Sequence, residues 1–122
     1  MDRLAASAEI NLRSAASRRY YAVYHRARIW LFNNRDGWQP DTNSSVHTQV
    51  WSQFGGQFLI RVRNRGFTAV QRRGNADYDV DLPFTREDFD KVTEDCRVIH
   101  GILDGLEGNA AEGRPSSPRQ NR

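Results

Sequence analysis

Cysteine and lysine are nearly missing from this 122-residue chain, and long apolar runs are missing altogether. Cys96 is the only cysteine, so no intrachain disulfide forms, and no Cys/His cluster has the spacing of a structural zinc site. No apolar run is long enough to span a bilayer, and the first residues lack the apolar core of a signal peptide. The sequence therefore predicts a one-domain cytoplasmic protein with no membrane segment, metal or other cofactor.

The basic residues are almost all arginines. Lys91 is the only lysine among 18 Lys and Arg residues, which oppose 15 Asp and Glu residues and leave a net charge of +3. Such an arginine excess is typical of a GC-rich genome, which is the interpretation we favour. It also suits phosphate recognition, because a planar guanidinium bonds two phosphate oxygens at once.

The first third of the chain contains no glycine or proline before Gly37, and residues 14–33 repeat with helical spacing. Aromatic and apolar side chains fall on one side of this helix: Tyr20, Val23, Tyr24, Ala27, Trp30 and Leu31. A second set falls on the opposite side: Arg18, Tyr21, Ala22, His25, Ile29 and Phe32. Only a narrow strip is expected to be solvated: Arg19, Arg26 and Asn33. The pattern predicts a central helix packed between neighbours on both sides, with the tyrosines and tryptophans serving the core before any base stacking.

A polar loop, residues 34–43, separates the central helix from a shorter one. Ser44 or Ser45 is expected to cap this second helix, which ends at Gly55-Gly56. Its inward residues are apolar: Val46, Val50, Trp51 and Phe54. A third helix is predicted from about Phe58 to Arg73, with Gly66 as a weak point, and Gly74-Asn75 should end it before an acidic connection over residues 76–83.

The last helix has the clearest local signals. Thr85 and Asp88 approximate a capping box, and apolar residues follow at steps of three and four: Phe89, Val92, Cys96, Ile99, Leu103 and Leu106. Cys96 is therefore expected to be buried, and His100 should lie at the edge of the apolar stripe. Residues 1–107 are predicted to form one all-α helical domain, and residues 108–122 a disordered basic tail.

Three segments, in order along the chain, resemble motifs of the HEPN family. Residues 17–27, SRRYYAVYHRA, resemble its central-helix signature of Ser-Arg, Tyr-Tyr-Ala, an aromatic residue, His and a small residue. His47, Val50 and Phe54 resemble the family's His, apolar and aromatic positions after the first loop. Residues 73–79, RGNADYD, resemble its Arg followed by Ala-Asp-Tyr-Asp. The resemblance covers roughly residues 14–106 and implies a HEPN-like up-and-down four-helix bundle.

HEPN proteins usually have a complete antiparallel helix before the Ser-Arg motif, whereas only 16 residues precede Ser17 here. The resemblance therefore implies an abbreviated first helix, which Leu4, Ala8 and Leu12 would line. A start site assigned too late is one alternative. Another is a groove filled by a second chain, which would favour the homodimer that the family commonly forms.

Arg18 and His25 are the candidate catalytic pair. They lie seven residues apart, about two helical turns, so both project from one face with Tyr21 between them. A His near neutrality can shuttle a proton of a 2′-hydroxyl while an Arg steadies phosphate charge. In catalytic HEPN proteins such a pair is thought to cleave RNA without metal. We favour a structural alternative, in which His25 bonds to Asp77 or Tyr78 and Arg18 forms an ion pair with the same acidic loop.

The remaining candidates would bind nucleotide or RNA: Arg19, Tyr21, His47, Arg73, Asp77 and Tyr78. For His47, in the first turn of its helix, a solvated or loop-bonded role is favoured. For Arg73, Asp77 and Tyr78, locking the third helix onto the central one is slightly favoured over binding phosphate, ribose or base.

The resemblance implies a module of a prokaryotic toxin–antitoxin or defence pair that binds nucleotide or RNA and works with a minimal nucleotidyltransferase partner. Such a partner would modify Tyr21, Tyr24 or Tyr78. The alternatives are a metal-independent endoribonuclease toxin that uses Arg18 and His25, and a nucleotide-sensing subunit without chemistry of its own.

Overall fold

The computed structural model describes residues 3–43, 45–78 and 83–112, and these ranges contain helices but no strand. The helices are α1 (Arg3–Asn34), α2 (Val46–Ser52), α3 (Gly56–Tyr78) and α4 (Arg86–Glu112). The predicted all-α class and the helical bundle are confirmed.

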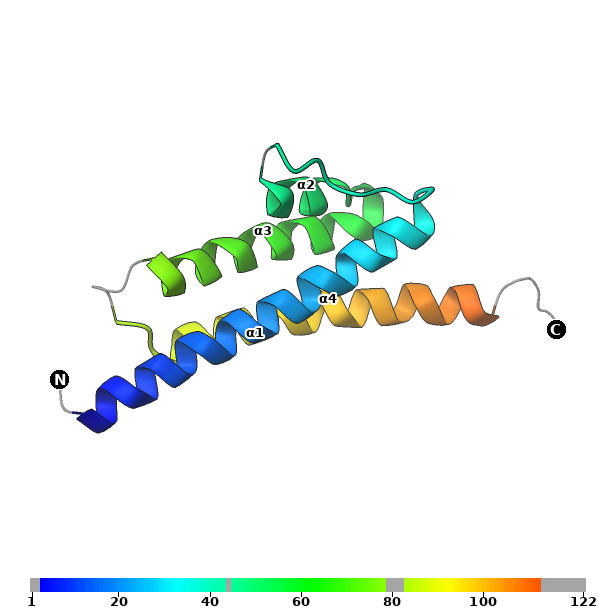
Figure 1. The fold of residues 1–122 in the computed structure, drawn as a ribbon. Helices are drawn as coiled ribbons and strands as arrows, with labels where there is room; N and C mark the ends of the chain where they lie inside the picture. Colours follow the sequence, from blue (N-terminus) through cyan, green and yellow to red (C-terminus); the bar gives the residue numbers. More distant parts are fainter. Residues whose placement is uncertain (1–2, 44, 79–82, 113–122) are drawn as a thin grey trace.

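The three long helices pack against one another pairwise, and short α2 contacts α1 and α3. Within the described part of the chain α2 makes no contact with α4. Figure 1 shows α3 running opposite to α1 and α4, with α2 on the side of α3 that faces away from α4. This arrangement leaves the face of α1 beside α2 as the place where α1, α2 and α3 meet.

The predicted apolar stripes form the core. In α1, Tyr20, Val23, Tyr24, Ala27 and Leu31 are buried and Trp30 is partly buried. The matching stripe of α4 is also buried, from Phe89 to Leu103 with Cys96 inside it, and Leu106 packs at its edge. Each large side chain removed from water contributes about 1.5–3 kcal/mol, so these two stripes hold most of the bundle together.

The structure corrects the expectation for the start of the chain. No separate abbreviated first helix exists, because α1 runs without a break from Arg3 to Asn34. Residues 13–17, RSAAS, contain neither glycine nor proline, so nothing in the local sequence ends a helix there. The first turns of α1 leave Leu4 83% and Ile10 61% exposed.

The expectation that α1 packs on both sides is also wrong. Its second face is exposed: Arg18, Tyr21, Ala22, His25, Ile29 and Phe32. In the strip expected to be solvated, Arg19 and Asn33 are exposed, as predicted. Arg26 differs, because it is half-buried and bonds to His100, Asp104 and Glu107 of α4. The long stem of Arg26 packs against α4 while its charged end binds acidic side chains, so this arginine lies in a helix interface although it is a charged residue.

Helix α2 begins at a cap and is anchored by Trp51. The Ser45 side chain accepts a hydrogen bond from the Thr48 N–H at 3.3 Å, which confirms one of the two predicted capping residues. Trp51 is fully buried against the bare backbone of Gly66 in α3. A Cβ at Gly66 would lie 2.1 Å from Cδ2 of the indole, so only glycine admits this contact. Gly66, predicted to be a weak point in α3, is therefore the position against which Trp51 packs.

Helices α3 and α4 are both longer than predicted. Helix α3 begins at Gly56 and continues through Gly74-Asn75 to Tyr78, so the predicted stop there is wrong. A glycine costs a helix about 1 kcal/mol, which packing of the same helix easily offsets. Helix α4 runs to Glu112, so the first residues of the predicted tail are helical. Residues 79–82 of the acidic connection and 113–122 of the tail lie outside the described residues.

The start of α4 confirms the capping box. The Thr85 N–H donates to Asp88 Oδ2 at 2.9 Å, and the Asp88 N–H donates to Thr85 Oγ1 at 3.1 Å. The bond from the Thr85 N–H, and then a second one from the Thr85 hydroxyl to Asp88 Oδ2 at 3.0 Å, lower the pKa of Asp88. None of the helices in the described ranges has both the length and the apolar content that crossing a bilayer takes.

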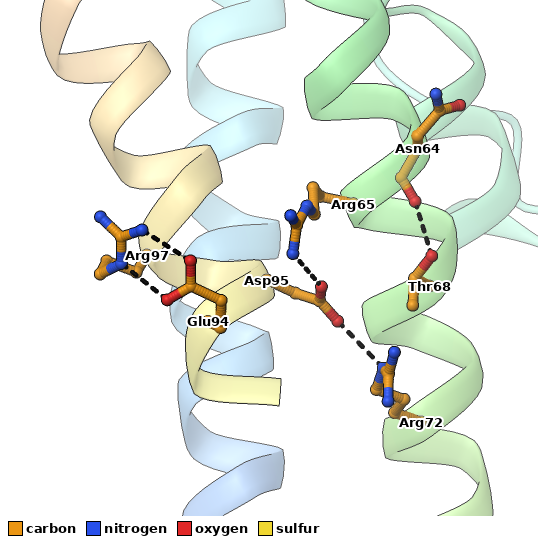
Figure 2. A network of polar contacts seen from close by, with 7 residues as sticks. All are labelled: Asn64, Arg65, Thr68, Arg72, Glu94, Asp95 and Arg97. Carbon is orange, nitrogen blue, oxygen red and sulfur yellow. Dashed lines mark hydrogen bonds and ion pairs between the residues drawn. The ribbon is translucent and has the colours of Figure 1, made fainter. Parts of the chain in front are cut away.

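A buried carboxylate joins α3 to α4. Figure 2 shows Asp95 of α4 between Arg65 and Arg72 of α3. Arg65 Nη1 donates to Asp95 Oδ1 at 3.0 Å, and Arg72 Nε lies 3.2 Å from Oδ2. Burial raises the pKa of Asp95 although both arginines act to lower it. The ion pairs therefore only partly offset the cost of removing this carboxylate from water.

Candidate functional site

An aromatic and basic cluster lies where α1, α2 and α3 meet. We call it the Tyr-His-Arg cluster, and its members are Tyr20, Tyr21, Tyr24, His25 and Arg28 of α1, His47 of α2 and Arg73 of α3. Tyr20, Tyr24 and Arg28 follow one another at steps of four residues, and so do Tyr21 and His25. Helical spacing therefore brings these side chains together on neighbouring lines of α1. The Ser45 cap fixes the start of α2 and so places His47 in its first turn.

A hydrogen-bond chain runs through the buried side of the cluster. Trp51 Nε1 donates to the Tyr20 hydroxyl oxygen at 3.0 Å, and the same hydroxyl lies 2.7 Å from His47 Nδ1. An indole N–H only donates, so the Tyr20 hydroxyl oxygen accepts from Trp51. The tautomer of His47 decides which partner donates in the bond between Tyr20 and His47.

Arg73 closes the cluster from α3. Its side chain is 8% exposed, and its guanidinium lies over two rings of α1, 5.6 Å from the centroid of Tyr20 and 5.2 Å from that of Tyr21. A guanidinium this close to ring faces is held by cation–π attraction. Arg73 thus packs α3 onto α1 and brings a positive charge behind the tyrosines.

The basic side chains of the cluster act on His47. The pKa of His47 is lowered, first by burial and then by the charges of Arg73, His25 and Arg28. Burial also raises the pKa of Tyr20 and Tyr24, so both phenols stay neutral near pH 7. A group of basic side chains and neutral phenols favours an anion.

His25 and Arg28 form the outer edge of the cluster. The His25 ring is 5.3 Å from that of Tyr24 and 6.0 Å from that of Tyr21, and the Arg28 guanidinium is 5.9 Å from the Tyr24 ring. His25 is exposed and Arg28 is half-exposed. A ligand in solution therefore reaches these two side chains without any rearrangement of the core.

The structure gathers some of the predicted binding residues. Tyr21, His47 and Arg73 come together in the cluster, and His47 bonds to Tyr20 instead of being solvated or bonded to a loop. Arg73 packs α3 onto α1, as the favoured alternative predicted. Arg19 is not brought in, because it faces α4, where its guanidinium lies 5.3 Å from the Phe89 ring centroid.

The candidate pair Arg18 and His25 shares one face of α1, as the spacing predicted. That face is exposed, so the pair does not point into a pocket inside the bundle. Asp77 and Tyr78 are in the last turn of α3, and their side chains lie outside the described residues. The predicted bond from His25 to these residues and the ion pair of Arg18 therefore stay predictions.

Arg28 is the cluster residue that sequence reasoning missed. The signal was its position four residues after Tyr24, since such pairs are neighbours on a helix surface. Within the described ranges, no three His, Cys, Asp or Glu side chains gather into a group able to hold a metal ion. Comparison of the chain with models of known protein families, with curated proteins and with solved structures gives no match.

Proposed function

We propose that this chain is a HEPN-type module that binds a nucleotide or RNA through phosphate at the Tyr-His-Arg cluster. One observation carries the proposal: the three segments that resemble HEPN motifs converge there. Tyr20 of the first segment bonds to His47 of the second at 2.7 Å, and Arg73 of the third lies over Tyr20 and Tyr21. The meeting of three segments far apart in the chain at one basic cluster supports the proposal.

Phosphate suits this cluster for chemical reasons. Arg28 and His25 stand at the surface as hydrogen-bond donors, and Arg73 adds positive charge from behind. A guanidinium binds phosphate oxygens with charge-assisted hydrogen bonds, which are stronger than neutral ones. Binding by such contacts weakens as salt is added.

Titration calorimetry with AMP and with a short single-stranded RNA tests the proposal. Arg28→Gln should weaken binding of both about tenfold, since a hydrogen bond to a charged group contributes about 1.5–3 kcal/mol. Arg86→Gln removes the same charge at the start of α4, where the side chain is largely exposed and pairs with Asp90, and should leave binding unchanged. Equal loss in both variants would mean that net charge alone attracts the ligand, and absence of binding by the wild type would refute the proposal.

A nucleotidyltransferase partner belongs to the proposal, with Tyr21 as the residue it modifies. Tyr21 is 37% exposed, whereas the Tyr24 hydroxyl is buried, and the Tyr78 side chain is outside the described part. Co-expression with a minimal nucleotidyltransferase should add a nucleotidyl group to the chain, seen by peptide mass spectrometry. Tyr21→Phe should abolish the adduct, and an adduct that persists in this variant would rule Tyr21 out.

A homodimer is proposed to form along the first turns of α1. Leu4 and Ile10 are large apolar side chains that are 83% and 61% exposed, on a segment that extends beyond its neighbours in Figure 1. Contact with a second copy would remove this surface from water. Sedimentation velocity should show a dimer that dissociates in the Leu4→Ser, Ile10→Ser variant, and a wild-type monomer at high concentration would contradict the proposal.

The second candidate function is a metal-independent endoribonuclease. It is favoured by the shared, solvent-accessible face that carries Arg18 and His25. Because His25 is exposed, His25→Ala should keep the fold, so loss of RNA cleavage in EDTA with an unchanged melting temperature would identify a catalytic residue. Cleavage that survives in this variant would come from another group or a contaminant.

A further inference from the structure

A cavity of about 300 Å³ opens beside the Tyr-His-Arg cluster, between the end of α1 and the loop that follows it. Its lining combines apolar, aromatic and polar side chains: His25, Arg28, Ile29, Phe32, Trp38 and Gln39. Its volume is at the lower end of the range for small-molecule sites. His25 and Arg28 belong to both the cavity and the cluster, so one ligand can occupy the two at once.

The loop that forms the outer wall is fixed to the end of α1. The Gly37 N–H donates to the Phe32 carbonyl at 2.9 Å, and the Trp38 N–H donates to the Arg35 carbonyl at 3.1 Å. Gly37 has a φ of 75°, which favours glycine, and its Cβ position would lie 3.7 Å from the Phe32 ring. These bonds therefore fix the backbone of the turn between Phe32 and Trp38, which both line the cavity.

The apolar part of the lining is unusually exposed. Ile29 is 62% and Phe32 is 48% exposed, next to the partly buried Trp38. Flat aromatic and apolar surface of this kind gains from covering by a planar apolar ring. At the edge, the Gln39 amide presents a donor and an acceptor together, the combination that the edge of a nucleobase matches.

We propose that this cavity is a nucleobase subsite, so that the ligand is a nucleotide whose base lies against Phe32 and Trp38 and whose phosphate lies at Arg28 and the cluster. The inference rests on the proposed phosphate binding at the cluster and deepens it by naming the second half of the ligand. Because His25 and Arg28 line the cavity and belong to the cluster, a base in the cavity would place its own phosphate within reach of Arg28. Both a free nucleotide and one residue of a single-stranded RNA have this chemistry.

Calorimetry with AMP, ribose 5-phosphate and a short single-stranded RNA separates the two parts of the site. The wild type should bind AMP about tenfold more tightly than ribose 5-phosphate, since that is a typical contribution of one stacked base. Phe32→Ala and Gln39→Ala should reduce AMP affinity toward that of ribose 5-phosphate while leaving ribose 5-phosphate affinity unchanged. Both side chains are exposed, so these variants should fold, which an unchanged melting temperature verifies.

The outcomes distinguish the two proposals. If none of the three ligands binds, phosphate recognition at the cluster fails. If AMP and ribose 5-phosphate bind equally, the cluster binds phosphate and the cavity is not a base subsite. The same conclusion follows if Phe32→Ala changes the oligomeric state, seen as a changed sedimentation coefficient, and leaves AMP affinity unchanged. If AMP binds more tightly than ribose 5-phosphate, the base subsite is supported. The ligand is then a free nucleotide if AMP binds more tightly than RNA, and a strand if RNA binds more tightly than AMP.

Discussion

Replacing Gly66 by alanine should destabilise the protein, although alanine is the better helix former. The new Cβ would lie 2.1 Å from Cδ2 and 2.3 Å from Cε3 of Trp51, whereas carbons in contact prefer about 3.5–4.0 Å. Trp51 is fully buried and donates to Tyr20 at 3.0 Å, so the indole moves only by losing that bond. Overpacking of this kind costs about 1–3 kcal/mol, and the lost bond about 1 kcal/mol more.

Alanine returns about 0.5–1 kcal/mol through helix propensity, so the net loss should be about 2 kcal/mol. Urea unfolding followed by circular dichroism measures it, and the melting temperature should fall by about 8 °C. The matched control is Gly101→Ala in α4, where a Cβ has nothing within 4 Å and the propensity gain should stand alone. If both substitutions raise the melting temperature, or if Gly66→Ala costs the same in a Trp51→Ala background, the contact with the Trp51 ring is not the cause.

Three further results are expected from the charged groups. The lowered pKa of His47 means that the unfolded chain binds more protons below the ordinary value of 6.5, so stability should fall from pH 7 to 5. His100 has the same sign, so His47→Gln should reduce the slope of melting temperature against pH without removing it. Because the pKa of Asp95 is raised, ionising its carboxylate lowers the free energy of unfolding increasingly as pH rises past 3.8. Asp95→Asn should therefore lower the free energy of unfolding in urea at pH 7 by less than about 1 kcal/mol, and a larger decrease would contradict this prediction. Arg26→Met should cost under about 1 kcal/mol and matter less in high salt, because Glu107 is about half exposed.

The parts of the fold that local chemistry decides could be predicted from the sequence. The steps of three and four from Phe89 to Leu103 predicted the buried stripe of α4, since helical geometry alone puts those side chains on one face. Thr85 and Asp88 predicted the start of the same helix, because their bonds lie within one turn. Such signals need no knowledge of which element packs where.

The parts that depend on neighbours could not. Both faces of α1 carry apolar side chains, and the periodicity does not say which face the long neighbours α3 and α4 will cover. Gly66 was predicted to be a weak point of α3, because glycine disfavours a helix. Its role as the contact surface of Trp51 could not be predicted, because it depends on how α2 packs on α3. Tertiary packing decided both cases against local preference.

The candidate site was predictable in part for the same reason. The motifs pointed to Tyr21, His47 and Arg73, which meet, because each lies on a long or well-capped helix. Arg19 went to the other side of α1 because one residue turns the helix by 100°. Arg28 belongs to no motif, and its position four residues after Tyr24 was the one sequence signal for its contact with the Tyr24 ring.

With seven residues, α2 is too short to persist in water without support. Its two turns exist because Trp51 is seated on α3, so the segment from the loop to Phe54 should open and reclose as one unit while the long helices stay folded. Amide hydrogens of α2 should therefore exchange with solvent sooner than those in the middle of α1 or α4. Each such opening would carry His47 away from Tyr20. The packing of the Trp51 indole against α3 therefore sets how long the basic site stays assembled.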